Sequence, residues 1–342
     1  MLRYIIKRII FAIPVLIGAT FLVFTIMDLA PGDPARIILG SNATEVALAS
    51  LRDSMGLNDP FLVRYGRFIL GLLHGDLGTS YRNGQAVFSL IMGRLGNTVV
   101  LATSGIVFSV IIGIPVGIIS AIKQYSVLDN ITMFITLFLM AVPTFWFALI
   151  LVIIFSLNLG WLPSSGMQHG FPDNLISLIL PTLTLGCGYA ALIARTTRSS
   201  VLEVVRQDYI DMARAKGLTE NAVIWKHMLK NALIPIVTVV GLNFGTLLGG
   251  SVLTESIFSW PGVGRFVVDS ISYKDTPAVL GSVVTLAILF TIVNLIVDPS
   301  MSLTIFCMRF WIQGLNLNIN HHGRGQRKNE HIKENREQFG TG

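Results

Sequence analysis

The side chains best suited to specific polar contacts lie between Arg195 and Pro235, where lysine and arginine residues are mixed with carboxylates. Side chains of these types recognise a partner through ion pairs and hydrogen bonds. The sequence lacks the patterns that would indicate covalent or metal chemistry: H-E-x-x-H, G-x-S-x-G and the phosphate-binding G-x-x-x-x-G-K-[ST]. Cys187 and Cys307 match no metal or redox spacing, so we expect ordinary apolar side chains. The sequence therefore predicts a binding segment and no catalytic, cofactor or metal site.

Local signals within this segment predict two short helices that form a compact knob. Ser200 and Glu203 have the spacing of a capping box, which predicts a helix start at this point. Gly217 is expected to end that helix, because glycine adopts the left-handed cap conformation at little cost. Thr219 is expected to cap the second helix. Two functions are open to such a basic knob: it binds a soluble partner, or it lies on anionic lipid.

The composition predicts that the rest of the chain is a membrane protein. Hydrophobic residues make up 52% of the sequence, charged residues only 13%, and the mean hydropathy is +0.68. A soluble chain carries about a quarter charged residues. Six apolar stretches approach the roughly 20 residues that a spanning helix needs: 9–29, 98–121, 131–157, 175–194, 233–253 and 278–297. The first runs on into Asp28 and Pro31, which indicates an uncleaved span rather than a signal peptide.

The distribution of lysine and arginine predicts the orientation of these spans. Basic residues are frequent before the first span, in the loop 195–232 and after the last span. The loop 158–174 has none, and 254–277 has only Arg265 and Lys274. We therefore expect both termini and the basic loop in the cytoplasm. The long loop 30–97 is expected outside, with helices near 44–55 and 61–73. It forms either an ordered cap or a surface that meets an extracellular partner or shapes a substrate entrance.

Ionisable residues are placed at the ends of the predicted spans rather than at their centres. Asp28, Glu255 and Asp298 each lie at or near an end. A proton- or sodium-coupled carrier usually needs carboxylates or broken helices near the bilayer midplane. This distribution disfavours a secondary carrier, and the missing catalytic patterns disfavour a membrane enzyme even more strongly.

Glycines recur at helical spacing in two of the predicted spans. Small residues four apart let helix backbones approach closely, which drives helix association in lipid. We expect this packing role for Gly113 and Gly117 in the second span and for Gly241, Gly245 and Gly249 in the fifth.

Residues 211–217, which read DMARAKG, resemble the EAA loop in membrane subunits of binding-protein-dependent ABC importers. Asp211 stands where that motif has Glu, and Ala213 and Gly217 match it. Of the later I-x-L-P part, this chain keeps only Leu229. Other segments resemble the first permease of dipeptide, oligopeptide and nickel importers, in order from residue 1 to 298: APGDP (30–34), NT (97–98), VPTFW (142–146), RTTRSS (195–200), NALIP (231–235), GGS (249–251), FSWPGVG (258–264) and NLIVD (294–298).

The resemblance implies a type I ABC importer permease fold in a prokaryotic inner membrane. It also implies several partners: a second homologous permease, one or two cytoplasmic ATPase subunits that hold ATP and magnesium, an extracellular or periplasmic substrate-binding protein, and membrane lipid, with no nucleic acid. The family's ATPase-coupling role would fall on Asp211, Ala213, Arg214, Lys216, Gly217 and Leu229.

The function expected on this basis is half of an ATP-driven translocation pathway for di- or oligopeptides, in a chain that is not itself an enzyme. The alternatives are nickel or another small peptide-like or metal-chelate substrate, and, from a different class, an ion-coupled secondary carrier. The binding protein is expected to select the substrate.

The sequence divides into three parts. Residues 1–97 hold the first span and the external loop, and 98–298 hold five spans and the coupling loop 195–232. Residues 299–342 depart from the family's usual Asp-x-x-Tyr ending, through either genuine variation or an altered reading frame. The polar composition of the chain from about residue 320 predicts a disordered tail.

Overall fold

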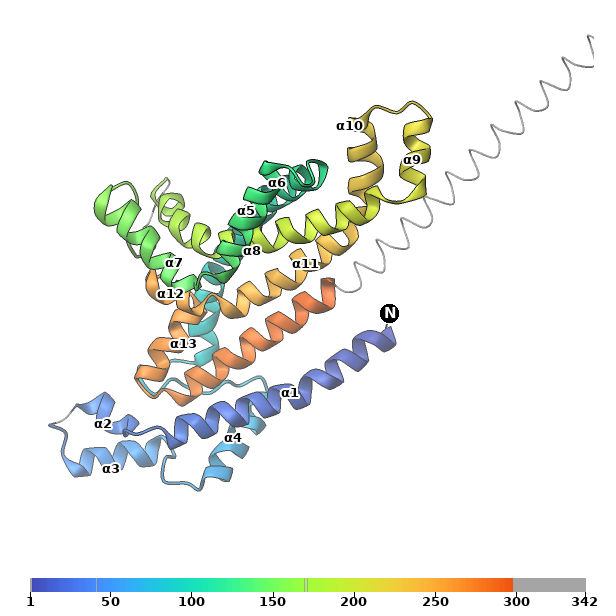
Figure 1. Cartoon of the computed structure of the whole chain (residues 1–342). Coiled ribbons are helices and arrows are strands. Elements are labelled where there is room, and N and C mark those ends of the chain that lie inside the picture. The colour runs from blue at the N-terminus through green and yellow to red at the C-terminus, as the bar shows by residue number, and fades with distance from the viewer. Residues whose placement is uncertain (1, 41, 169, 171, 298–342) are drawn as a thin grey trace, which may run out of the picture. The chain divides into compact units, whose positions relative to one another are not determined.

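A computed structural model describes the chain except for residues 1, 41, 169, 171 and 298–342. Its described residues form helices joined by turns and loops, and the only strand-like pairing among them is an isolated bridge between Thr79 and Ala86. The predicted all-α fold is confirmed (Figure 1). The predictions for Asp298, Cys307 and the segment 299–342 lie outside the described residues.

Among the described residues, five helices are long and apolar enough to cross a membrane. They are Ile5–Leu29 within α1 (Leu2–Leu29), Val87–Ile122 (α5), Asp173–Val205 (α8), Lys226–Gly250, which contains α11 (Leu229–Gly250), and Thr276–Val297. A bent pair of helices supplies one further crossing if it is counted as a single span. On that count, the described residues contain the six spans that the sequence predicts.

The bent pair lies where the sequence predicts one continuous span at 131–157. α6 (Val127–Ala141) is followed by α7 (Thr144–Leu151) and the π-helix η1 (Val152–Asn158), and the chain turns by 103° between α6 and the second half. Pro143 explains the break. A proline disfavours the helical conformation in the residue before it, and Val142 is accordingly extended, with φ −72° and ψ 127°.

The helix start predicted at Ser200 is wrong. α8 continues without interruption from Asp173 to Val205, and Ser200 lies inside it with 7% of its surface exposed. The neighbouring Val201 is 1% exposed and packs in an apolar cluster with α5. Burial of this last part of α8 outweighs the local preference of serine for a helix start, so the basic loop begins only after Val205.

The external loop contains the two helices that the sequence predicts, and a third. These are α2 (Pro34–Leu39), α3 (Glu45–Ser54) and α4 (Phe61–Leu73). Asp33 caps α2 by accepting a hydrogen bond from the Ala35 amide at 3.1 Å, and Thr44 caps α3 by accepting one from Ala47. The rings of Phe61 and Tyr65 on α4 meet Phe21 and Phe24 at the end of α1. The loop is thereby fixed to the first span.

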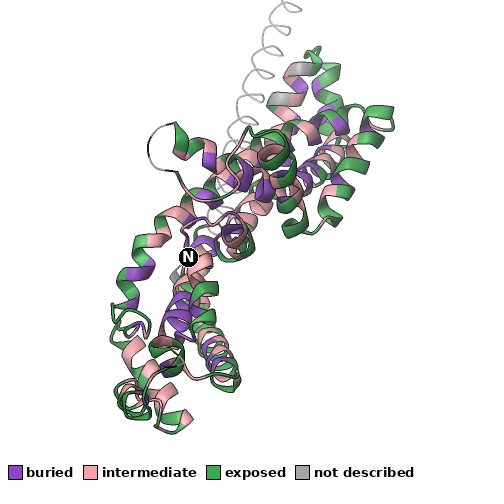
Figure 2. Cartoon of the chain, turned by 90° about the vertical axis from the view of Figure 1, so that its left-hand side faces the viewer, coloured by how far each residue is buried: buried purple, intermediate pink, exposed green. Residues whose placement is uncertain are grey.

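The closest helix contact joins α5 and α8. A methyl group at Gly113 would lie 2.7 Å from the Ala190 carbonyl oxygen, and one at Gly117 would lie 2.5 Å from that of Ala194. Only glycine permits this approach, because real Cβ atoms essentially never come within 3.0 Å of another heavy atom. Ser109 adds a hydrogen bond across the pair to the Gly186 carbonyl at 2.9 Å. Figure 2 shows buried residues concentrated where such helices meet.

Two of the regularly spaced glycines of α11 differ in their surroundings. A methyl group at Gly245 would meet the Phe290 ring at 3.3 Å in the helix Thr276–Val297. One at Gly249 would have no described atom within 4 Å beyond its own helix. Gly249 therefore packs against no described residue of this chain, and the packing role of Gly241 and Gly249 stays a prediction.

We predict that Gly117→Ala destabilises the protein, because the added methyl group must push α5 away from α8. Overpacking of this kind typically costs about 1–3 kcal/mol. The matched control is Gly188→Ala in α8, where a methyl group would meet nothing within 4 Å. Thermal unfolding in detergent should show a lower midpoint for Gly117→Ala and a midpoint near wild type for Gly188→Ala. Equal midpoints for all three proteins would contradict the close contact.

Candidate functional site

The basic loop folds into a helical hairpin at one end of the spans. α9 (Asp208–Ala215) follows α8 directly, and the chain returns through α10 (Glu220–Ala222) and the π-helix η2 (Val223–Met228) into α11. Figure 1 shows α9 and α10 side by side beyond the end of α8, at the opposite end of the spans from α2–α4. The knob predicted from the sequence is therefore present, although it starts later than the capping-box signal indicated.

An apolar core holds this hairpin against the spans. Ile210 and Ala213 on the inner face of α9 are 0% and 6% exposed. They belong to one buried cluster with Ile118 and Ala121 of α5, Val201 of α8, Val223 and Met228 of η2, and Ala232 and Ile236 of α11. Full burial of the valine, isoleucine and methionine side chains among them typically contributes about 1.5–3 kcal/mol each. The hairpin is consequently part of the helical body rather than a loose loop.

A polar contact supports the same arrangement. Asn231 at the start of α11 donates a hydrogen bond from Nδ2 to the Tyr209 hydroxyl at 2.9 Å. Burial raises the pKa of Tyr209 above its ordinary value, so the hydroxyl stays protonated at neutral pH. Tyr209 and Asn231 lie on separate helices, so the sequence carries no local signal of their contact.

The outer face of the hairpin is polar and exposed. Arg214 pairs with Glu220 (Nε to Oε1, 2.9 Å) and with Asp211 (Nη1 to Oδ1, 3.3 Å). The hydrogen bond to Glu220 raises the pKa of Arg214, which stays charged in any case. Exposed pairs of this kind are worth roughly 0–1 kcal/mol, so they contribute little to folding. They hold these charged groups at defined positions on the exposed surface of the hairpin.

Gly217 ends α9 in the way that the sequence predicts. Its φ is +79°, in the left-handed region, and its amide donates to the Arg214 carbonyl at 2.9 Å. A methyl group at this position would meet nothing within 4 Å, so the requirement for glycine comes from the backbone conformation and not from space. Thr219 then caps α10 by accepting a hydrogen bond from the Ala222 amide.

The predicted coupling residues divide into two groups. Asp211, Arg214, Lys216 and Gly217 are exposed on the hairpin. Ala213 is buried, and Leu229 is half-buried and packs against the same apolar cluster. The first group lies on the exposed surface of the hairpin, whereas Ala213 and Leu229 pack against its apolar core.

A second group of contacts joins the first half of α5 to the FSWPGVG segment (258–264). Trp260 donates from Nε1 to the Asn97 carbonyl at 2.9 Å, and Asn97 donates from Nδ2 to the Pro261 carbonyl at 3.0 Å. The fully buried Glu255 of α12 (Val252–Ile257) accepts from the Arg265 amide at the start of α13 (Val263–Ser272). A methyl group at Gly262 would collide with the Glu255 carboxylate. These contacts give the Trp260 ring nitrogen a partner and leave no room for a side chain at position 262.

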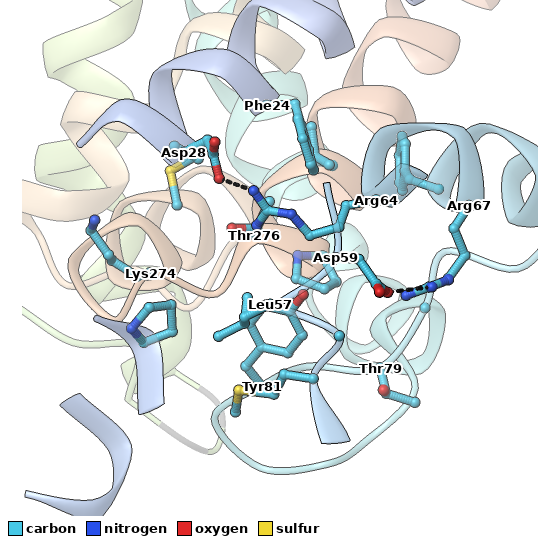
Figure 3. A pocket seen from close by; sticks show the side chains of 18 of the residues that line it. Phe24, Asp28, Leu57, Asp59, Arg64, Arg67, Thr79, Tyr81, Lys274 and Thr276 are labelled. Carbon is cyan, nitrogen blue, oxygen red and sulfur yellow. Dashed lines mark hydrogen bonds and ion pairs between the residues drawn. The ribbon is translucent and has the colours of Figure 1, made fainter. Parts of the chain in front are cut away.

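An open cavity of about 870 Å³ lies between the loop 30–97, the end of α1 and residues 274–280. Figure 3 shows Arg64 reaching Asp28 and Arg67 reaching Asp59 across its wall. Arg52 pairs with Asp33 at 2.6 Å, and hydrogen bonds from Arg52 and the Ala35 amide hold the pKa of Asp33 below its ordinary value although burial acts in the opposite direction. These ion pairs order the loop, which agrees with the interpretation of the loop as a structured cap.

The described residues contain no group of three or more histidine, cysteine or acidic side chains that could hold a metal ion. Cys187 is a free, half-buried thiol in α8. The described residues instead provide two surfaces suited to binding: a charged hairpin at one end of the spans and an ordered loop at the other.

Comparison with known protein families gives two matches. Residues 113–303 match the family described as "Binding-protein-dependent transport system inner membrane component", and residues 1–102 match its N-terminal counterpart. Together the matches cover most of the chain. The chain therefore belongs to the family of membrane components of binding-protein-dependent transport systems, and this membership supports the permease interpretation over an ion-coupled carrier.

Three curated relatives show the similarity in detail. The dipeptide transport system permease protein DppB of Alkalihalophilus pseudofirmus is 44% identical over 321 residues. The oligopeptide permease protein AppB of Bacillus subtilis is 41% identical over 304 residues, and the glutathione permease protein GsiC of Salmonella typhimurium is 40% identical over 298 residues. Each alignment covers 87% of this chain and 96% of the relative.

A solved structure shares the fold. The inward-facing MetNI methionine ABC transporter contains a chain that matches with a TM-score of 0.52 and 20% sequence identity, over 64% of this chain and 97% of that one. At this level of identity the match supports the type I importer permease fold alone.

We predict that Gly217→Val impairs transport without preventing membrane insertion. A β-branched residue in the left-handed conformation costs roughly 1–2 kcal/mol, which corresponds to a factor of about 5–30 in the population of the native cap. The matched control is Gly217→Asn, because asparagine tolerates this conformation. Uptake by cells with equal membrane levels of each variant should fall for Val and stay near wild type for Asn. Normal uptake with Val would show that the cap is unimportant.

Proposed function

We propose that this chain is the permease half of an ATP-driven importer for di- or oligopeptides, and that the hairpin α9–α10 receives the motion of a cytoplasmic ATPase. The observation that carries the proposal is the construction of the hairpin. Its exposed face bears Asp211, Arg214 and Lys216, while its inner face shares one buried cluster with α5, α8 and α11. A force applied to the outer face is therefore passed directly to spanning helices.

The division of labour follows from what this chain lacks. It has no phosphate-binding loop in its sequence, so ATP and magnesium are assigned to separate ATPase subunits. A second homologous permease completes the translocation pathway, and a binding protein delivers the cargo from outside. The hairpin and the ordered loop α2–α4 lie at opposite ends of the spans (Figure 1), which fits a cytoplasmic hairpin and an external loop. The lysine and arginine distribution supports the same orientation, with both termini inside.

Peptides are the proposed cargo because the relatives reported above are named for dipeptides, oligopeptides and glutathione. These names favour peptides over nickel or another metal chelate. The binding protein makes the final selection, so the permease needs only a pathway that tolerates peptides.

Reconstitution in lipid vesicles tests the proposal. The purified chain alone should transport nothing, with or without a pH or sodium gradient, because its sequence has no phosphate-binding loop and the energy is proposed to come from the ATPase subunits. Addition of the second permease, the ATPase subunits and a dipeptide-loaded binding protein should give ATP-dependent uptake. Gradient-driven uptake by the chain alone would contradict the proposal in favour of a secondary carrier.

A charge reversal in the same system tests the role of the hairpin. Asp211→Lys should reduce both uptake and co-purification of the ATPase subunits, since it reverses a charge on the docking face. The matched control is Glu45→Lys on α3: the side chains of Asp211 and Glu45 are 75% and 76% exposed, and each pairs with an arginine. Glu45→Lys should leave ATPase co-purification unchanged. Equal retention of the ATPases by both variants would contradict docking at Asp211.

A further inference from the structure

The carboxylate of Asp129 is almost fully buried, and each of its two oxygens accepts two hydrogen bonds. Asp129, in the first turn of α6, has a side chain that is 2% exposed. Arg198 donates to it as a fork, from Nε to Oδ1 and from Nη2 to Oδ2, both at 2.8 Å. The Ser120 hydroxyl donates to Oδ1, and the Tyr125 amide donates to Oδ2 at 3.0 Å. Four donors thus occupy the acceptor positions that an ionised carboxylate offers.

These four donors come from the elements that surround the inner end of α6. Ser120 belongs to the last turn of α5, and Tyr125 to the turn between α5 and α6, where its φ is +63°. Arg198 belongs to the inner part of α8, which leads directly into the hairpin. The start of α6 is therefore held by α5, by the turn and by α8 at a single side chain.

Residues next to two of these donors belong to the apolar packing that supports the hairpin. Ile118 and Ala121 flank Ser120 on α5, and Val201 follows Arg198 by one turn on α8. All three are members of the buried cluster that holds Ile210 and Ala213 of α9. Among the described residues, no member of that cluster belongs to α6. The hairpin is thus fixed to α5 and α8 by apolar packing, while α6 is joined to the inner ends of the same two helices through Asp129.

We infer that the ion pair of Asp129 and Arg198 is the positioning element that passes the displacement of the hairpin on to the bent span of α6 and α7. The inference rests on the proposed function, because it takes the hairpin as the place where the ATPase acts. A forked, charge-assisted contact fixes both the direction and the distance between the two side chains. The span that receives the displacement is the one that turns by 103° at Pro143, which has no amide hydrogen to donate to the preceding turn of α6.

The test separates transmission from simple support of the fold. It uses the assembled complex in vesicles: both permeases, the ATPase subunits and a dipeptide-loaded binding protein. ATP hydrolysis and peptide uptake are measured on equal amounts of complex, and their ratio is the readout. A contact that only stabilises the fold changes the amount of complex but not this ratio.

Asp129→Asn removes the charge and keeps the shape of the side chain. We expect ATP hydrolysis to persist while uptake per ATP falls about tenfold, within the range of typical coupling free energies between sites. Arg198→Lys keeps the charge and loses the fork, so an intermediate ratio is expected. The control is Asp33→Asn, which removes the charge from another carboxylate that accepts two arginine hydrogen bonds: Arg52 Nε and Nη2 both donate to Oδ2 of Asp33, at 3.0 and 2.6 Å. The control should keep the wild-type ratio.

An unchanged ratio in Asp129→Asn, or an equal fall in Asp33→Asn, would overturn the inference while leaving the proposed function intact. If Asp129→Asn does not assemble, the double variant Asp129→Asn with Arg198→Gln replaces it, since that variant leaves no unpaired buried charge. The double variant should show the same fall, and a wild-type ratio in it would also overturn the inference. Absence of ATP-dependent uptake in the wild-type complex is a separate outcome: it would refute the proposed function, and the inference with it.

Discussion

The contact between α5 and α8 is the constraint on which the other features depend. Lipid gives no hydrophobic drive for helices to associate, so close packing and hydrogen bonds between helices must hold a bundle together. Gly113 and Gly117 allow α5 to lie against the backbone of α8, and Ser109 bonds across the gap. Because the two helices are fixed at this distance, the side chains at their ends have defined partners. Substitution of either glycine would displace both ends at once.

Each end of α5 then anchors a different functional element. At one end, Asn97 and Thr98 hold the turn between α12 and α13, the latter by accepting a hydrogen bond from the Val263 amide at 2.8 Å. At the other end, Ile118 and Ala121 support the hairpin, and Ser120 bonds to Asp129. The α5–α8 pair therefore acts as a rigid member that connects the hairpin with the turn at the far end of the spans. The span of α6 and α7 is bent by 103° and is joined to this pair through Asp129.

The sequence predicted the features that have local causes. Apolar runs of sufficient length indicated the spans, and the left-handed cap at Gly217 followed from the special conformational freedom of glycine. It also predicted that Gly113 and Gly117 would serve helix packing, and in the structure both lie against α8.

Features with non-local causes were missed or wrongly predicted. The capping-box signal at Ser200 failed because tertiary burial of the inner end of α8 outweighs a local preference. The break at Pro143 was not foreseen, because proline is tolerated inside many membrane helices and only the surrounding packing decides whether it breaks one. Asp129 and Arg198 lie far apart in the sequence, and no spacing rule connects them. The row of Gly241, Gly245 and Gly249 could not reveal which neighbour each glycine would meet.

The most direct test of the account asks what touches the exposed face of α9. Met212 lies on that face with 59% of its surface exposed. A cysteine at this position, in a chain whose Cys187 and Cys307 are replaced by serine, can carry a photoreactive label in the assembled complex. A label at Val46 on α3, which is 81% exposed, serves as the control. The account predicts a covalent adduct between the ATPase subunit and position 212 but none at position 46. Adducts of position 212 with lipid alone would contradict it and would favour a hairpin that lies on the membrane surface.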